Sequence, residues 1–116
     1  MEKSVLVIDD DKTFCEFLVE ILTQKGFRVS STTDGLAGYA MAVQDPYDLA
    51  IIDVRMPGVL GTELAERLRK NKPQLTVILI SAFADELLAR TAAAIGVPLL
   101  SKPFSANRLY EVIGKH

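Results

Sequence analysis

Five short apolar runs alternate with five amphipathic stretches along this chain, and that alternation restricts its fold more than any other feature. The runs are Val5 to Ile8, Phe27 to Ser31, Leu49 to Ile52, Thr76 to Ile80 and Pro98 to Leu100. Three of them, VLVI, LAII and TVILI, are continuously apolar and rich in Val and Ile, which is typical of strands buried on both faces of a parallel sheet. The second run, FRVSS, alternates and becomes polar, which favours an edge strand.

Residues with helical spacing separate the runs. The first such stripe is Phe14, Phe17, Leu18, Ile21 and Leu22, and Gly26 is placed to end that helix. Weaker stripes are Leu36, Ala40 and Val43; Leu60, Leu64 and Leu68; Leu87, Leu88 and Ile95; and Leu109, Val112 and Ile113, with Ser105 as the N-cap of the last. This order of strands and helices predicts one doubly wound α/β domain over residues 1–116.

The composition excludes several classes of partner. The 116 residues are 49% hydrophobic, which is enough to bury a core, and 13 basic against 15 acidic residues leave a net charge of −2. That balance provides no electrostatic footprint for nucleic acid or for an anionic membrane. The single cysteine, Cys15, excludes an internal disulfide, and no run reaches the roughly 18 apolar residues of a membrane span. We therefore expect a cytoplasmic domain that contacts neither nucleic acid nor membrane.

Polar residues that can do chemistry follow four of the five runs. They are Asp9, Asp10 and Asp11 after the first, Asp53 after the third, Ser81 after the fourth and Lys102 after the fifth. The carboxyl ends of strands in an open parallel sheet share the edge where ligands bind, so these side chains are expected to converge. Several carboxylates at one edge repel one another unless a divalent cation lies among them, and an all-oxygen ligand set suits Mg²⁺.

Lys102 and Ser81 supply what the carboxylates lack, a positive charge and a hydrogen-bond donor for an incoming anion. An aspartate can act as a nucleophile toward phosphorus and form an aspartyl phosphate, while a metal ion and a lysine offset the charge on the phosphoryl oxygens. Each residue alone would be an ordinary cap or loop residue. Together they indicate phosphate chemistry.

Four motifs in fixed order strengthen this interpretation: VLVIDDD, LAIIDVRMPG, VILISAFA and LLSKPF. The chain, over essentially its whole length, resembles the receiver domain of two-component response regulators. The resemblance implies a flavodoxin-like, five-stranded parallel sheet in the order 2-1-3-4-5 with five helices. It also implies a signalling switch, and not a classical enzyme, that accepts a phosphoryl group from a partner.

The resemblance assigns the acidic residues as follows. Asp53, followed by VRMPG, matches the phosphoacceptor. Asp10 matches the direct Mg²⁺ ligand, and Asp9 its neighbour, which orients the metal or holds it through water. The backbone carbonyl of Arg55, two residues after the acceptor, is the expected third protein ligand. Asp11 differs from these three aspartates, because its place before a predicted helix favours a helix cap.

The remaining matches concern the response to phosphorylation. Ser81 matches the switch hydroxyl and Lys102 the lysine that pairs with the phosphoryl group, while Pro103 is expected to fix the following loop, with a cis peptide as one option. A departure is Leu99, where the family commonly has a Tyr or Phe whose rotation reports phosphorylation. Phe83 flanks the pocket and is expected to shield the acyl phosphate from water.

The expected phosphodonor is a histidine kinase or a phosphotransfer protein, and the expected target is a downstream protein or a covalently linked output domain. A homodimer through the final helices is left open. The phenylalanines of the first stripe, together with Phe27 and Cys15, are assigned only to core packing.

Two rival functions remain open. A small phosphatase of the haloacid-dehalogenase type would use Asp9 as its nucleophile, because Asp9, Asp11 and Thr13 spell DxDxT after an apolar strand. This hypothesis leaves IIDVRMPG unexplained and lacks the acidic pair expected after a later strand. A phosphate-independent pseudo-receiver is favoured by Leu99 and disfavoured by the complete set of chemical residues.

Overall fold

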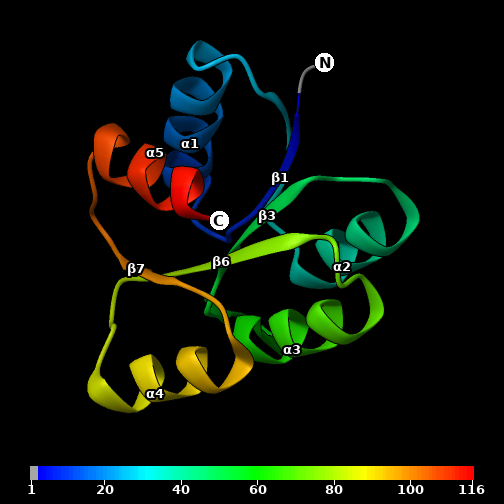
Figure 1. Cartoon of the computed structure of the whole chain (residues 1–116), viewed down its shortest axis with the longest axis vertical. Helices are drawn as coiled ribbons and strands as arrows, with labels where there is room; N and C mark the ends of the chain where they lie inside the picture. Colours follow the sequence, from blue (N-terminus) through cyan, green and yellow to red (C-terminus); the bar gives the residue numbers. More distant parts are fainter. Residues whose placement is uncertain (1–2) are drawn as a thin grey trace.

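The structure, a computed structural model, describes residues 3–116 (Figure 1). Its elements in chain order are β1 (Ser4–Ile8), α1 (Lys12–Gln24), β2 (Arg28–Thr32), α2 (Gly35–Gln44), β3 (Leu49–Asp53), β4 (Arg55–Met56), β5 (Val59–Leu60), α3 (Gly61–Asn71), β6 (Thr76–Ser81), α4 (Glu86–Ile95), β7 (Leu99–Ser101) and α5 (Ala106–Lys115). Five strands form a parallel sheet in the order β2-β1-β3-β6-β7. Once the short β4–β5 hairpin is set aside, this is the predicted order 2-1-3-4-5, so the flavodoxin-like fold is confirmed.

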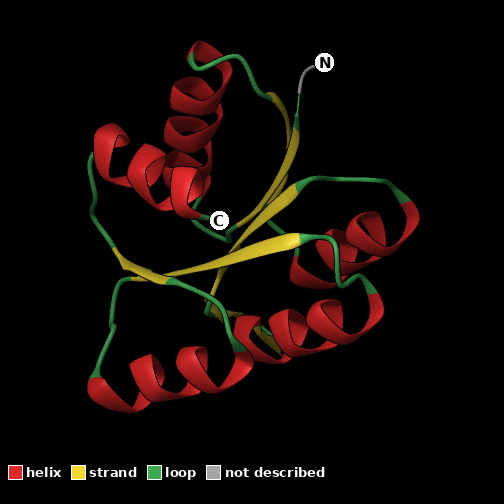
Figure 2. Ribbon diagram, in the orientation of Figure 1, coloured by secondary structure: helices red, strands yellow, loops and turns green. Residues whose placement is uncertain are grey.

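Helices cover both faces of the sheet (Figures 1 and 2). The helices α1 and α5 lie on one face, and α2, α3 and α4 lie on the other. Side chains of β1 alternate between the two layers: Leu6 and Ile8 pack in the layer of α2 to α4, whereas Val5 and Val7 pack in the layer of α1 and α5. Because both faces are buried, the inner strands need apolar residues at every position, as the continuous Val and Ile runs predicted.

Local signals at the element ends agree with the sequence. The Asp11 carboxylate accepts a hydrogen bond from Phe14 N at 3.1 Å and caps α1, and Ser105 Oγ accepts one from Arg108 N at 3.1 Å and caps α5. The Lys102–Pro103 peptide bond is cis. The predicted polar strand is β2, which lies at the edge of the sheet.

The predicted inner stripe of α2 is wrong. Leu36 is 67% exposed, and Ala40 and Val43 are also exposed, whereas Gly35, Gly38 and Ala42 are buried. The reason is the close approach of this helix to β1: a Cβ added at Gly38 would lie 2.6 Å from Ile8 Cδ1. The two glycines and Ala42 therefore face the sheet, whereas Leu36 and Val43 face outward and Tyr39 and Met41 pack partly against the core.

Two further leucines are exposed, although the spacing predicted them to be buried. Leu60 is the N-cap residue of α3, and Leu87 lies in the first turn of α4. Their partners Leu64 and Leu68 are buried as expected, and Leu88 packs against the core. In α3 and α4 the predicted stripe therefore holds except at its first residue, Leu60 or Leu87. Among residues 3–116, no helix is long and apolar enough to cross a membrane.

The β4–β5 hairpin was not predicted from the sequence. It accounts for the presence of a glycine, Gly61, at the position that follows it. Gly61 N donates a hydrogen bond to Val54 O at 2.8 Å, which brings the start of α3 against the end of β3. A Cβ at Gly61 would overlap the carbonyl oxygen of Asp53 and would lie 2.8 Å from Val54 Cα. Both are backbone atoms, so relief requires a shift of the main chain next to Asp53.

We predict that Gly61→Ala lowers the free energy of unfolding by about 1 to 3 kcal/mol, because the added methyl group collides with backbone. The matched control is Gly114→Ala in α5, where nothing lies within 4 Å of the added Cβ. This control is expected to leave stability unchanged or to raise it by about 0.5 to 1 kcal/mol. Urea denaturation followed by circular dichroism measures both, and equal stabilities for the two variants would contradict the prediction.

Candidate functional site

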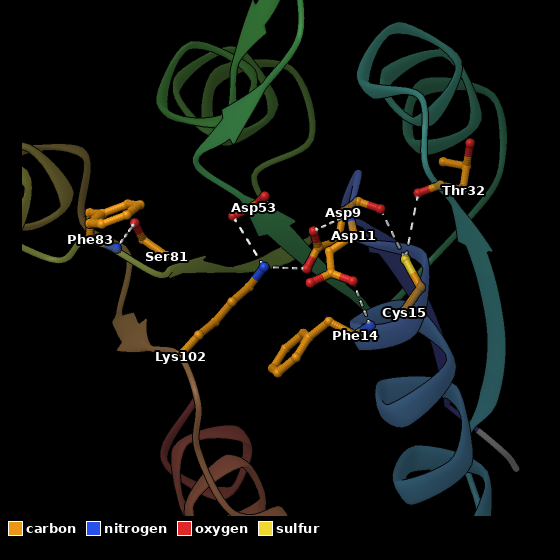
Figure 3. Close-up of polar contacts among 9 residues, drawn as sticks. All are labelled: Asp9, Asp11, Phe14, Cys15, Thr32, Asp53, Ser81, Phe83 and Lys102. Carbon is orange, nitrogen blue, oxygen red and sulfur yellow. Dashed lines mark hydrogen bonds and ion pairs between the residues drawn. The ribbon is translucent and has the colours of Figure 1, made fainter.

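The carboxyl ends of four parallel strands bring the predicted residues together at one edge of the sheet (Figure 3). Asp9 follows β1, Asp53 ends β3, Ser81 ends β6 and Lys102 follows β7. In the register of the sheet, Ile8 pairs with Ile52 and Asp53 pairs with Ile80, so these ends are level with one another. The prediction that these side chains converge is confirmed for the three carboxylates and the lysine described below.

Three carboxylates form a compact cluster. Asp9, Asp10 and Asp53 each offer an oxygen, and these oxygens lie within 4.8 Å of one another. Asp9 is fully buried and Asp53 is 5% exposed, whereas Asp10 is exposed. Two buried carboxylates and one at the surface describe a site that is open to solvent on one side.

The two oxygens of Asp9 have different surroundings. Oδ1 accepts a hydrogen bond from Asp11 N at 3.0 Å. Oδ2 is buried, and its partner among residues 3–116 is the Lys102 ammonium, which forms an ion pair with it at 2.7 Å. A buried carboxylate oxygen normally takes more than one partner. A buried oxygen paired with one ammonium and lying beside two other carboxylates therefore fits a divalent cation that prefers oxygen ligands.

Lys102 opposes the negative charge of the cluster from the other side. Its Nζ lies 2.7 Å from Asp9 Oδ2 and 3.6 Å from Asp53 Oδ1, and its side chain is 11% exposed. Because β6 lies between β7 and β3, the lysine side chain must reach across the end of β6 to make these contacts (Figure 3). One ammonium thus neutralises part of the charge of two carboxylates.

The pKa of Asp53 is raised to about 7. Burial is the main cause, and the negative charge of Asp9 adds to it, while Lys102 acts in the opposite direction. Ionisation of the Asp53 carboxyl therefore lowers the stability of the folded chain when no cation neutralises its charge.

Ser81 is buried at the end of β6, and its Oγ accepts a hydrogen bond from Phe83 N at 3.0 Å. The serine hydroxyl keeps its own proton to donate. Arg55 and Phe83 meet above the edge of the sheet, with Arg55 Cζ 5.4 Å from the centroid of the Phe83 ring. Both line an open groove of about 540 Å³ that also includes Asp10 and Leu87. The carbonyl of Arg55 as a metal ligand stays a prediction.

Asp11 does not join the cluster of carboxylates. Its side chain is exposed and holds the first turn of α1 through Phe14 N. In the phosphatase hypothesis this second aspartate of DxDxT would act beside the nucleophile. Its use as a helix cap weighs against that hypothesis.

Two residues at the site have contacts that the sequence reasoning missed. Cys15 Sγ donates a hydrogen bond to Asp9 O at 3.1 Å, and burial, followed by the Asp9 charge, raises the pKa of this thiol to about 11. The Phe14 ring lies under the Lys102 ammonium, 4.7 Å from Nζ to the centroid. The one sequence signal for these contacts is the position of Phe14 and Cys15 in the first turn of the predicted helix after Asp9 to Asp11. That turn starts at the edge of the sheet where the carboxylates lie.

Comparisons with known proteins agree with this geometry. A family model described as response regulator receiver domain matches residues 5–114. The chain is 35% identical over 108 residues to the transcriptional regulatory protein TctD of Salmonella typhimurium, covering 90% of this chain and 47% of TctD. It is 32% identical over 114 residues to the response regulator receiver protein CpdR of Brucella abortus, covering 97% of this chain and 95% of CpdR. The chain thus spans about half the length of TctD and nearly all of CpdR.

Two solved structures share the fold. A CheY-like receiver domain protein from Methanospirillum hungatei superposes with a TM-score of 0.92 at 26% identity, covering 99% of this chain and 93% of that one. The response regulator TrrA from Thermotoga maritima, solved in complex with Mg²⁺-BeF, superposes with a TM-score of 0.88 at 30% identity and covers 97% of each chain.

We predict that Asp53→Asn raises the free energy of unfolding in metal-free buffer at pH 8 by about 1 to 3 kcal/mol, because it removes a buried charge that repels Asp9. The raised pKa gives the sign of the pH dependence. Below pH 7 the wild-type carboxyl becomes neutral, so the gain shrinks as the pH falls toward 5.

Denaturation at pH 8 and at pH 5.5 measures this difference. Asp45→Asn is the matched control, because Asp45 is exposed at the end of α2. A gain from Asp53→Asn that is equal at both pH values would contradict the prediction.

Proposed function

This chain belongs to the response regulator receiver domain family, and we propose on that basis that it is a phosphorylation switch that accepts a phosphoryl group on Asp53. The observation that carries the proposal is the buried Asp53 carboxylate, held between two further carboxylates and the Lys102 ammonium at the open edge of the sheet. We treat residues 1–116 as a single receiver domain.

The proposed reaction is a direct phosphoryl transfer. A carboxylate oxygen of Asp53 attacks the phosphorus of a phosphohistidine, the new O–P bond forms, and the P–N bond breaks with its electron pair leaving on the imidazole. Receiver domains accept phosphate from histidine kinases, so the proposed donor is a histidine kinase or a phosphotransfer protein. Hydrolysis of the acyl phosphate resets the switch.

The residues around Asp53 fit a Mg²⁺ ion. Asp9, Asp10 and Asp53 would hold it, together with the backbone carbonyl of Arg55, and the grouping of three carboxylate oxygens within 4.8 Å of one another supports this assignment. When bound, Mg²⁺ offsets the negative charge of the transferring phosphoryl group. The family as a whole and the Mg²⁺-BeF complex of TrrA support the same ion.

Ser81 and Lys102 are proposed to respond to the new charge. The Lys102 ammonium is already 3.6 Å from Asp53 Oδ1, and the Ser81 hydroxyl can donate its proton to a phosphoryl oxygen. Ser81 at present accepts a bond from Phe83 N, so its reorientation would disturb the loop after β6. The population of a partner-binding surface would shift with it.

The target of the switch is proposed only as a class of partner. TctD is a transcriptional regulator more than twice as long as the match, whereas CpdR is spanned almost completely. The target is therefore proposed as either a covalently linked output domain or a separate protein, in the cytoplasm. A homodimer is one form that the partner surface could take.

Intact-protein mass spectrometry tests the phosphoacceptor. After incubation with a small acyl phosphate, we expect one phosphoryl adduct that requires Mg²⁺ and is absent from Asp53→Asn. Asp11→Asn is the matched control: asparagine caps a helix as well as aspartate does, and Asp11 lies outside the cluster, so the adduct should remain.

Failure of the wild-type protein to form an adduct at high donor concentration would favour the pseudo-receiver. Steady turnover of an aryl phosphate that is lost in Asp9→Asn and kept in Asp53→Asn would instead favour the phosphatase.

The lifetime of the acyl phosphate is expected to depend on Phe83. Its ring lies against the Arg55 guanidinium and lines the groove that also includes Val54, the residue after the acceptor. We predict that Phe83→Ala shortens the lifetime several-fold, because water gains access to the phosphorus. Decay of the adduct after donor removal measures this, with Leu87→Ala, another exposed residue of the same groove, as the control. An unchanged lifetime of the acyl phosphate in Phe83→Ala would contradict this prediction.

A further inference from the structure

Lys102 makes a third contact, which the proposed function does not use. Its Nζ lies 4.7 Å from the centroid of the Phe14 ring, within the distance at which a ring face attracts an ammonium. Figure 3 shows this ring beside the terminal part of the Lys102 side chain. The attraction is strengthened because only 11% of the lysine side chain is exposed to competing water.

The Phe14 ring is itself held by two other rings. Phe104 meets it edge to face at 5.3 Å, and Phe17 lies 5.4 Å away with a tilt of 50°. Phe104 is two residues after Lys102 and belongs to the same loop. The segment that carries the ammonium therefore also carries the ring that orients its aromatic partner, and together they join α1 to the loop before α5.

Binding of a cation changes the balance around Lys102. In the structure the ammonium is closer to Asp9 Oδ2, at 2.7 Å, than to Asp53 Oδ1, at 3.6 Å. A divalent cation on Asp9 would neutralise the charge that holds the ammonium there. The ring of Phe14 carries no net charge, so its attraction for Lys102 survives the arrival of the metal.

We propose that Phe14 is a positioning residue for Lys102. Its ring, held by Phe104, keeps the ammonium beside Asp53 when Mg²⁺ occupies Asp9, so that the phosphoryl group meets a lysine that is already oriented. This inference rests on the proposed function of Asp53 and Lys102 and adds a residue on α1 to it.

Kinetics give the first test. With saturating Mg²⁺, Phe14→Leu is expected to slow phosphorylation of Asp53 by a small acyl phosphate about five-fold, because the ring face is lost while the apolar volume is largely kept. Phe14→Tyr retains a ring face and is expected to restore the rate. Phe17→Leu is the matched control, since it removes a ring from the same helix that touches Phe14 and not Lys102.

A spectroscopic measurement tests the contact between Phe14 and Lys102 without phosphorylation. In protein with carbon-13-labelled lysine, the ε-methylene protons of Lys102, identified through Lys102→Arg, are expected upfield of the other lysines because of the Phe14 ring current. Phe14→Leu should abolish that shift, Phe14→Tyr should keep it, and titration with Mg²⁺ should leave it in place.

Loss of the upfield shift on adding Mg²⁺, or a rate in Phe14→Leu equal to the wild-type rate, would overturn the role of Phe14 while leaving the phosphoacceptor assignment intact. Absence of any wild-type adduct would overturn the phosphoacceptor assignment, and the Mg²⁺ titration would still show whether Phe14 holds Lys102.

Discussion

Repulsion among three carboxylates, offset by one lysine, is the interaction on which the site depends. Asp9 and Asp53 are buried side by side because β1 and β3 are neighbours in the centre of the sheet. Lys102 comes from the other side, beyond β6, and reaches both. The strand order β1-β3-β6-β7 sets this arrangement, because it places Lys102 across the end of β6 from the two aspartates. A charge arriving at Asp53 therefore acts directly on the group that now neutralises Asp9.

The packing of the two apolar layers offsets the electrostatic cost of burying these carboxylates. The inner strands are buried on both faces, so the sheet is held along its length by packing that does not involve the charged edge. The raised pKa of Asp53 shows that the folded chain keeps this carboxyl in an environment that disfavours its charge. Strain of this kind is typical of a functional site, where local stability is lowered in favour of chemistry.

The sequence predicts the parts of the fold that are set by burial and by strand order. Continuous Val and Ile runs indicated inner strands, and the rule that ligands meet the carboxyl ends of parallel strands placed Asp9, Asp53 and Lys102 together before any distance was known. The orientation of α2 escaped prediction, because it depends on how closely Gly38 approaches Ile8 and not on the helical spacing of leucines. The contact of Phe14 with Lys102 escaped for a similar reason, since 88 positions separate the two residues and only the assembled sheet brings them together.

Leu99 raises the question of how a change at Asp53 travels outward. It has no ring to rotate, and it packs with the layer of α2 to α4. The rings near Lys102 belong to the opposite layer: Phe14 lies in the first turn of α1, and Phe104 precedes α5. Displacement of the ammonium toward a phosphoryl group would alter its contact with Phe14 first, and through the edge-to-face contact it would reach Phe104. In this chain, therefore, the aromatic contacts of Lys102 lead to the α1 and α5 face, whereas the Ser81 to Phe83 hydrogen bond leads to the loop before α4.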